Sequence, residues 1–206
     1  MANQNSNIDY TELKTPERVE KLKRVLEKRQ KTFTVVMENV HDPHNLSAAV
    51  RSCDAVGIYD IHMIYHKEQE RPKLGRQSSG SARKWVDQHF YTDIDSCYNK
   101  LRSEGKKIFT THLGETSKSL YDLDLTDPIA LVFGNEHSGV SQEAVDKADG
   151  NFIIPQVGMI QSLNISVAVA VSVYEVFRQR SKSGMFDSIE FDKNEFDVLL
   201  NEWLSR

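Results

Sequence analysis

Short apolar segments alternate with amphipathic helical patterns along most of this chain, and this alternation restricts its fold more than any other feature. Strands are predicted at residues 33–38, 61–65, 86–91, 107–111, 129–133 and 152–154. Helices are predicted between or after them, at residues 45–56, 94–104, 141–148 and 164–180. Strands that alternate with helices pair in parallel, and the helices then cover both faces of the sheet. The sequence therefore predicts an α/β fold with a mainly parallel sheet.

Two further helical patterns flank this core. Thr15, Pro16 and Glu17 are typical of an N-cap, a first helical residue and an acidic first turn, and they predict a helix that runs to Gln30. Beyond Gly184, a residue typical of a helix C-terminus, apolar residues at helical spacing predict an amphipathic terminal helix. We divide the chain into an N-terminal basic extension, a core domain and a C-terminal extension, at residues 1–31, 32–182 and 183–206.

The charge of the chain is unevenly distributed. Its net charge of −4 argues mildly against RNA binding, because contacts to phosphates need lysine and arginine. Basic side chains nevertheless gather on one face of the first predicted helix, at Lys21, Arg24 and Lys28, and again within residues 71–84. From the residues alone, a solvated helix surface and an RNA contact explain the first group equally well.

The sequence indicates neither a membrane protein nor a secreted one. No apolar run is long enough to cross a bilayer, and the first residues lack the basic-then-apolar order of a secretory signal. Cys53 and Cys97 are the only cysteines, and no His/Cys spacing typical of a metal site is present. We therefore expect a cytoplasmic protein with two reduced thiols and no metal ion.

Two polar segments follow predicted strands, at the edge where open α/β sheets bind ligands. Residues 39–51 run through a proline turn into a helix and include Asn45 and Arg51. Residues 129–140 open from a strand into Gly134 and Glu136. Taken singly, Arg51 is better explained by a surface ion pair, and Glu136 by a loop carboxylate that caps backbone N–H groups.

A third segment, residues 153–166, is apolar and carries no charge over its whole length. Exposed loops rarely have this composition, so we expect it to be buried or folded over a ligand, with Pro155 and Gly158 fixing its path. Ser162 or Asn164 is expected to cap the helix that follows. Composition and periodicity alone indicate only an α/β enzyme with a site at the strand ends.

At these three segments the chain resembles the SpoU family of RNA ribose methyltransferases, within the SPOUT superfamily. The matching residues, in the order and spacing of the family, are NVHDPHNLSAAVRSCDAVG, LVFGNEHSGVSQEAVDKADG and IIPQVGMIQSLNISVAVAVSVYEVFRQR. The resemblance implies a SPOUT-type α/β fold with a deep C-terminal trefoil knot that holds the cofactor, and a homodimer with sites near the subunit interface. It also implies that a methyl group passes from S-adenosylmethionine to a ribose 2′-hydroxyl in tRNA, with S-adenosylhomocysteine as product. Guanosine 18 in the D-loop is the expected position.

The resemblance further assigns roles to residues at matching positions. The predicted cofactor contacts are Thr111, His112, Leu113, Phe133, Gly134, Ile154, Met159, Ser162 and Leu163. The predicted catalytic set around the reacting atoms is Arg51, Asn45, Glu136, Ser162 and Asn164. The predicted tRNA contacts are His44, Arg178, Arg180 and the basic helix face of Lys21, Arg24 and Lys28.

The family assigns activation of the ribose hydroxyl to the position of Arg51. A guanidinium is a poor base because it hardly deprotonates. We therefore expect Arg51 to bind the neighbouring RNA phosphate and to place it so that it takes the proton. The alternative is strong local desolvation of the guanidinium, which favours its neutral form.

Two other functions stay open. A 2′-O-methyltransferase for rRNA, or for another tRNA position, would share the chemistry. A separate N-terminal RNA-binding domain of about a hundred residues is expected for the rRNA variant, so the short basic extension favours tRNA. A catalytically silent RNA-binding scaffold is the other candidate, and the joint presence of the five predicted catalytic residues argues against it.

Overall fold

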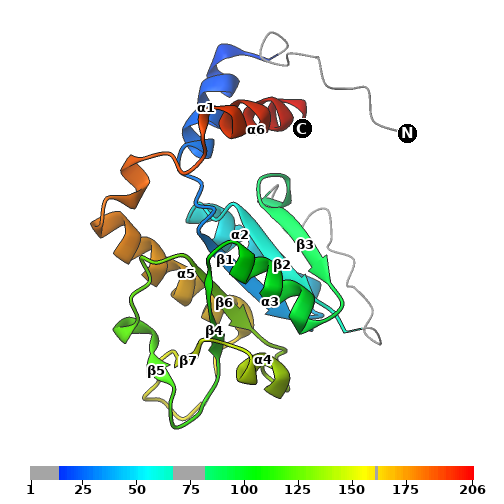
Figure 1. Cartoon of the computed structure of the whole chain (residues 1–206), viewed down its shortest axis with the longest axis vertical. Helices are drawn as coiled ribbons and strands as arrows, with labels where there is room; N and C mark the ends of the chain where they lie inside the picture. Colours follow the sequence, from blue (N-terminus) through cyan, green and yellow to red (C-terminus); the bar gives the residue numbers. More distant parts are fainter. Residues whose placement is uncertain (1–13, 67–81, 161) are drawn as a thin grey trace.

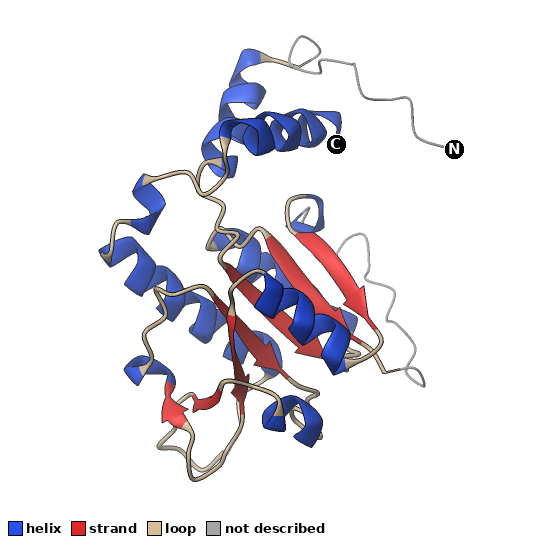
Figure 2. Ribbon diagram, viewed as in Figure 1, coloured by secondary structure: helices blue, strands red, loops and turns tan. Residues whose placement is uncertain are grey.

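The computed structural model describes residues 14–66, 82–160 and 162–206, and it contains a seven-stranded sheet with helices on both sides (Figures 1 and 2). The strands are β1 (Phe33–Glu38), β2 (Asp60–Ile64), β3 (Asp87–Tyr91), β4 (Lys107–Thr111), β5 (Lys118–Ser119), β6 (Ile129–Phe133) and β7 (Gly150–Ile153). The α-helices are α1 (Pro16–Leu26), α2 (Pro43–Ala55), α3 (Ile94–Ser103), α4 (Gln142–Asp146), α5 (Ile165–Lys182) and α6 (Lys193–Ser205). Short 3-10 turns are η2 (Ala82–Lys84), η3 (Leu120–Asp122) and η4 (Met185–Asp187).

The strands lie in the order β3-β2-β1-β6-β4-β7-β5, and every pair of neighbours in the described residues is parallel. β1 and β6 lie near the centre of the sheet and are buried along their whole length. A central parallel strand is covered on both faces, which explains why these strands are almost continuously apolar. The predicted α/β fold with a mainly parallel sheet is confirmed.

Two layers of helices cover the sheet. Side chains of α2 and α5 pack with strand residues such as Val35 and Ile61 in one hydrophobic core. Side chains of α3, with Ala144 of α4, pack with Val36 and Ile64 in a second core on the other face. Neighbouring strand residues therefore belong to opposite cores, as the alternation of side chains along a strand requires.

The two flanking helices pack against each other. α1 and α6 lie side by side at one end of the molecule (Figure 1), although they come from opposite ends of the chain. Leu22 and Leu26 of α1 form a small hydrophobic core with Leu200, Trp203 and Leu204 of α6. The apolar face predicted for the terminal helix thus covers the apolar face of the first helix.

Several predicted boundaries are corrected by the structure. α2 begins at Pro43 rather than at Asn45, because the Asp42 side chain accepts a hydrogen bond from the backbone N–H of His44 and so caps the helix. α1 ends at Leu26, short of Gln30, because Gln30 pairs with Ile58 as an isolated parallel bridge. The short strand β5 was not predicted, since two residues are too few to leave a periodic pattern.

None of the helices in the described residues is both long and apolar enough to cross a membrane.

Candidate active site

Four neighbouring strands bring the three predicted segments together. β1 pairs with β6, β6 with β4, and β4 with β7, all in parallel, so their carboxyl ends share one edge of the sheet. The segment after β1 carries Asn45, the segment after β6 carries Glu136, and the segment after β7 carries Asn164. The sheet thus places residues that are far apart in the sequence at one site.

Asn45, Glu136 and Asn164 form a chain of side-chain hydrogen bonds. Asn45 Nδ2 donates to Glu136 Oε1 at 2.9 Å, and Asn164 Nδ2 donates to Asn45 Oδ1 at 3.1 Å. Asn164 Oδ1 accepts from the backbone N–H and the hydroxyl of Ser166, and so caps α5. Of the two predicted caps, Asn164 therefore has this role. The Asn45 amide is held by a partner on each side, which orients it toward a fixed direction.

Arg51 and Ser162 lie outside this network. Both are exposed, and Arg51 follows Asn45 by six positions on α2, which rotates it by about 120° around the helix. Among the described residues, Arg51 has neither a hydrogen bond nor an ion-pair partner. The surface ion pair that could have explained a lone arginine is therefore not formed in the described part of the chain.

Glu38 and Asn39 tie the loop after β1 to the loop after β6. Glu38 is buried, its Oε2 accepts from the backbone N–H of Ser141 at 2.8 Å, and its Oε1 lies 2.9 Å from His66 Nε2. Asn39 has a φ of 52°, a left-handed conformation that asparagine tolerates, and its carbonyl accepts from Asn135 Nδ2 at 2.7 Å. Sequence reasoning missed these residues. The available signal was a carboxylate at the end of an otherwise apolar strand.

The loop after β6 folds back on itself. Asn135 and Gly139 exchange backbone hydrogen bonds of 3.0 and 2.9 Å, and Asn135 Oδ1 accepts from the backbone N–H of His137 at 2.8 Å. A Cβ atom on Gly134 would lie 2.0 Å from the carbonyl carbon of Gly139. Glycine is therefore required at Gly134 by the chain's own loop. Asn135, not Glu136, satisfies the local N–H groups, which leaves the Glu136 carboxylate for Asn45.

The predicted cofactor contacts lie around the same edge. Thr111 ends β4, Phe133 ends β6 and Ile154 follows β7, while His112 and Leu163 are half-buried nearby in the sequence. Leu113 and Met159, by contrast, are 80% and 98% exposed.

Of the two alternatives expected for residues 153–166, burial within the chain does not hold for the middle of this segment. Val157, Met159 and Ile160 are all exposed, because no described element of the chain covers them. An exposed group of large apolar side chains usually marks a surface that another molecule covers. The ligand-binding interpretation of this segment therefore gains weight over the interpretation as a buried structural loop.

Arg180 is not available to RNA, which corrects its predicted role. Its side chain is fully buried and lies over the ring of Phe33. The guanidinium donates to the carbonyls of Leu125, Thr32 and Asp127 and to the side chains of Gln30 and Thr32. Burial lowers the pKa of Arg180 to about 10. The residue holds α5 to the segments before β1 and β6.

The other predicted RNA contacts are on the surface. Lys21 and Arg24 are exposed on α1, and His44 is exposed at the start of α2. Lys28 donates to the carbonyl of Phe186. Arg178 is exposed on α5, and its guanidinium donates to both carboxylate oxygens of Glu175 at 2.7 and 2.8 Å.

The weaker RNA candidate within residues 71–84 falls largely outside the described residues. Arg71, Lys73 and Arg76 lie outside them, whereas Arg83 and Lys84 are described and exposed.

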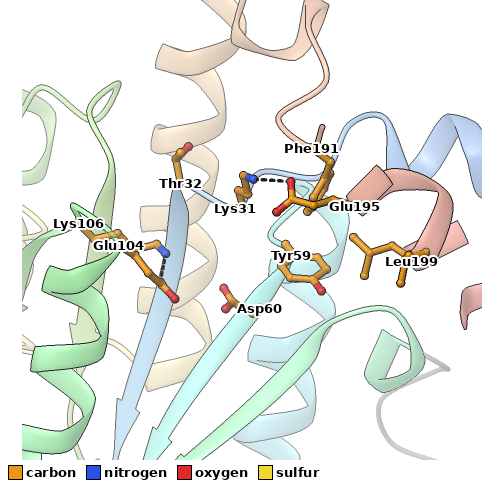
Figure 3. Close-up of a pocket in the computed structure, with 10 residues that line it drawn as sticks. Lys31, Thr32, Tyr59, Asp60, Glu104, Lys106, Phe191, Glu195 and Leu199 are labelled. Carbon is orange, nitrogen blue, oxygen red and sulfur yellow. Dashed lines mark hydrogen bonds and ion pairs between the residues drawn. The ribbon is translucent and has the colours of Figure 1, made fainter. Parts of the chain in front are cut away.

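A second group of polar residues lies near the opposite edge of the sheet. A cavity of about 500 Å³ is lined by residues that precede β1, β2 and β4 and by α6 (Figure 3). Asp60 lines this cavity and lies beside His62 and His89. Although burial alone would raise the pKa of the Asp60 carboxyl, the two histidines hold it well below its usual range. The expectation of no metal ion was based on sequence spacing, which could not detect this group.

Known proteins resemble the chain along most of its length. A tRNA (guanosine(18)-2′-O)-methyltransferase of Thermus thermophilus is 39% identical over 197 residues, which cover 94% of this chain and 98% of the relative. A crystal structure of the Aquifex aeolicus TrmH/SpoU tRNA modifying enzyme matches with a TM-score of 0.85 and 37% identity, covering 92% of this chain and 95% of that one.

A more distant solved structure is that of the SpoU methyltransferase AviRb from Streptomyces viridochromogenes in complex with the cofactor AdoMet. It is 22% identical, with a TM-score of 0.63, and the match covers 74% of this chain and 59% of that one. At this identity the likeness concerns the fold alone. The cofactor AdoMet is bound in that structure of AviRb. The model of the SpoU rRNA Methylase family matches residues 32–174. The chain therefore belongs to the SpoU rRNA Methylase family.

Proposed function

We propose that this protein transfers a methyl group from S-adenosylmethionine to the ribose 2′-hydroxyl of guanosine 18 in tRNA. The observation that carries this proposal is the hydrogen-bonded chain of Asn164, Asn45 and Glu136 at the carboxyl ends of parallel strands. The likeness to the Thermus thermophilus tRNA enzyme, which extends over nearly the whole of both chains, supports the substrate. The cytoplasm is the proposed location because tRNA is the proposed substrate.

The residues at this edge suit S-adenosylmethionine. The cofactor combines an adenine ring and the methylene groups of its methionyl chain, which suit apolar contacts, with polar and charged groups that need hydrogen-bond partners. Leu113, Met159 and Ile160 are exposed apolar side chains on segments without regular structure, where backbone groups are also available. We propose that the predicted cofactor contacts together bind S-adenosylmethionine. S-adenosylmethionine, when bound, supplies an electrophilic methyl group.

The side-chain network orients the acceptor ribose. Glu136 and Asn164 hold the Asn45 amide from two sides, so the amide geometry is set before substrate arrives. In-line attack on a methyl group needs close alignment of the attacking oxygen, and pre-positioned groups supply much of that alignment. Arg51 then binds the phosphate next to the ribose, and this phosphate takes the hydroxyl proton. An exposed arginine that has no hydrogen bond or ion pair within residues 14–66, 82–160 and 162–206 suits this role, because none of these contacts must break when it binds a phosphate.

We propose that tRNA also contacts Lys21 and Arg24 on α1 and Lys28 just beyond the end of this helix, together with His44 and Arg178. Lys21 and Arg24 are both exposed on α1. Contacts of this kind position an RNA without reading its sequence. Arg180 is omitted from this set because it is buried.

We further propose a homodimer and a C-terminal trefoil knot. Val167, Tyr174 and Phe177 are exposed on α5 at positions that repeat at helical spacing, and they form an apolar stripe. Such a stripe is typical of a protein–protein interface. Sedimentation at twice the mass of one chain would support the dimer, and sedimentation at the mass of a single chain would contradict it.

The test of the function is methyl transfer from labelled S-adenosylmethionine to unmodified total tRNA and to rRNA, followed by mapping of 2′-O-methylation. We expect label at a guanosine in the D-loop of tRNA with the unaltered chain. With Arg51→Ala we expect no label there. Label in rRNA or at another tRNA position would keep the chemistry and overturn the substrate. Absence of transfer to every RNA would favour a non-catalytic RNA-binding scaffold.

A further inference from the structure

Three side chains that can bind metal ions meet on one face of the sheet, at β2 and β3. Asp60 and His62 are two positions apart on β2, so their side chains share a face. His62 pairs with His89 in the parallel register of β2 and β3, which places the second histidine beside the first. The group is far from Asn45 in the fold, since Asp60 begins β2 whereas the candidate active site follows the ends of the strands.

The distances within this group match those around a metal ion. Asp60 Oδ2 lies 3.5 Å from His62 Nε2 and 3.2 Å from His89 Nε2, and one ligand atom from each residue lies within 4.8 Å of the others. Nitrogen and oxygen ligands bind Zn²⁺ at about 2.0–2.2 Å, so two ligands of a tetrahedral site are roughly 3.3 Å apart. The observed separations therefore leave room for one ion between the three side chains.

Two polar atoms in this group lack a hydrogen-bond partner. Asp60 Oδ1 and His62 Nε2 are buried, and neither forms a hydrogen bond in the described structure. Buried polar atoms are nearly always satisfied, because an unpaired one costs about 1–3 kcal/mol. A cation bound by His62 Nε2 and the Asp60 carboxylate would provide the missing partner.

The surroundings orient the group for this role. His62 Nδ1 lies 3.0 Å from the hydroxyl of Tyr91, which can hold the ring with Nε2 toward Asp60. Ligand histidines in metal sites commonly have such a partner on the second ring nitrogen. The side chain of His89 is 43% exposed, so a metal ion and a water ligand can enter from this side.

Nearby cations do not compete for the Asp60 carboxylate. Lys106 and Lys31 line the same cavity as Asp60, but Lys106 pairs with Glu104 and Lys31 with Glu195 (Figure 3). In the described part of the chain, neither lysine is hydrogen-bonded to Asp60.

We propose that Asp60, His62 and His89 bind one divalent transition-metal ion of the Zn²⁺ type. Two imidazole nitrogens and one carboxylate form a ligand set that favours Zn²⁺, Co²⁺ or Ni²⁺ over Mg²⁺, which prefers oxygen ligands. Three protein ligands leave a further position for water. The ion links the edge strand β3 to β2, and its effect is therefore on the stability of this part of the sheet.

The test uses the untagged full-length protein after removal of metal ions. Zn²⁺ is titrated in competition with a chromophoric chelator, and Co²⁺ is titrated separately while its visible absorption is recorded. We expect one equivalent of either ion to bind, with the Co²⁺ absorption typical of a site with fewer than six ligands. His89→Gln should weaken Zn²⁺ binding at least about 100-fold, because a direct ligand matters more than the outer-shell partners whose loss costs 10–100-fold.

His66→Gln is the matched control, because His66 also faces a carboxylate, that of Glu38 at 2.9 Å, but has no second histidine in its group. This variant should bind Zn²⁺ as the unaltered chain does. Thermal unfolding provides a second readout: Zn²⁺ should raise the Tm of the unaltered chain and not that of His89→Gln, and Mg²⁺ should raise neither. Failure of the unaltered chain to compete with the chelator, or equal binding by His89→Gln, would overturn the proposal. None of these measurements depends on methyl transfer.

Discussion

Arg51 is the residue on which the proposed proton transfer depends. Arg51→Ala should lower the rate of methyl transfer at least about 100-fold, as is typical for loss of one pre-positioned polar group. The free energy of unfolding of this variant should stay within about 0.5 kcal/mol of that of the unaltered chain, because the Arg51 side chain is exposed and has no partner in the described structure. Single-turnover transfer to unmodified tRNA and urea denaturation measure the two effects.

Arg51→Lys separates charge from shape at the same position. Lysine keeps the positive charge but lacks the planar fork that grips a phosphate with two hydrogen bonds. We expect the transfer rate of Arg51→Lys to fall at least about tenfold, to a value between the rates of the unaltered chain and of Arg51→Ala. Arg102→Lys, at an exposed position of α3, is the control and should transfer normally. Nearly full turnover by Arg51→Lys would refute the need for a bidentate contact.

Arg178 and Arg180 are two residues apart on α5 but should respond oppositely. Arg180→Ala removes a buried guanidinium and leaves the carbonyls of Leu125 and Asp127 without their donor, so we expect a loss of about 3 kcal/mol in the free energy of unfolding. Arg178→Ala removes an exposed ion pair and should cost less than about 1 kcal/mol, while weakening tRNA binding. Urea denaturation and a tRNA-binding titration compare the variants. Equal stability of the two variants would contradict the structural role of Arg180.

The sequence could predict roles better for residues that act within one segment than for residues that act across segments. Asn164 was one of two predicted helix caps, because capping depends on neighbours in the sequence. The resemblance could not distinguish Arg180 from Arg178, because burial depends on what packs against α5. Asp60, His62 and His89 were missed for the same reason, since only the register of β2 and β3 brings them together.

Among the elements, the loop after β6 is fixed by its own backbone. Gly134→Ala should lower the free energy of unfolding by about 2 kcal/mol, because the new Cβ atom would meet the backbone of Gly139 at 2.0 Å. Gly158→Ala is the matched control in the apolar loop after β7, where nothing lies within 4 Å of an added Cβ atom. It should leave stability within about 0.5 kcal/mol. A Gly134→Ala variant as stable as Gly158→Ala would show that the loop has another conformation.

The basic face of α1 should contribute to tRNA affinity in a salt-dependent way. The double variant Lys21→Ala, Arg24→Ala removes two exposed positive charges. The slope of the logarithm of the tRNA association constant against the logarithm of the salt concentration should therefore become shallower by up to about 2. The double variant Lys100→Ala, Arg102→Ala makes the same change of charge on α3 and is the control. Filter binding at several salt concentrations measures both. An unchanged slope for the α1 variant would assign this face to a solvated helix surface.

The elements were predictable to the extent that their patterns are local. β1, β4 and β6 match their predicted ranges. For β1 and β6 the reason is that nearly continuous apolar stretches mark buried strands. The start of α2 was missed although Asp42 and Pro43 carry the signals of a cap and a first turn. The exposure of Val157 and Met159 could not be predicted. An apolar loop has the same sequence pattern whether its own chain or another molecule covers it.

In the whole molecule, the order of the strands determines where chemistry can occur. β6 pairs with β1 in the sheet, although four strands, β2 to β5, lie between them in the sequence. This order brings Asn45 and Glu136 together, with Asn45 Nδ2 at 2.9 Å from Glu136 Oε1. Asp60, His62 and His89 lie near the opposite edge of the sheet. A sequence pattern indicates parallel pairing and a site at the strand ends, but it does not indicate this order. The residues of the site could therefore be grouped only through the family resemblance.

The most direct test of the proposed function compares two tRNA transcripts that differ by one atom. One carries guanosine at position 18 and the other carries 2′-deoxyguanosine there, so that only the proposed acceptor oxygen is missing. With labelled S-adenosylmethionine, the first transcript should take up one methyl group per molecule and the second should take up none. Equal labelling of both transcripts would place the methyl group on another atom and contradict the proposal.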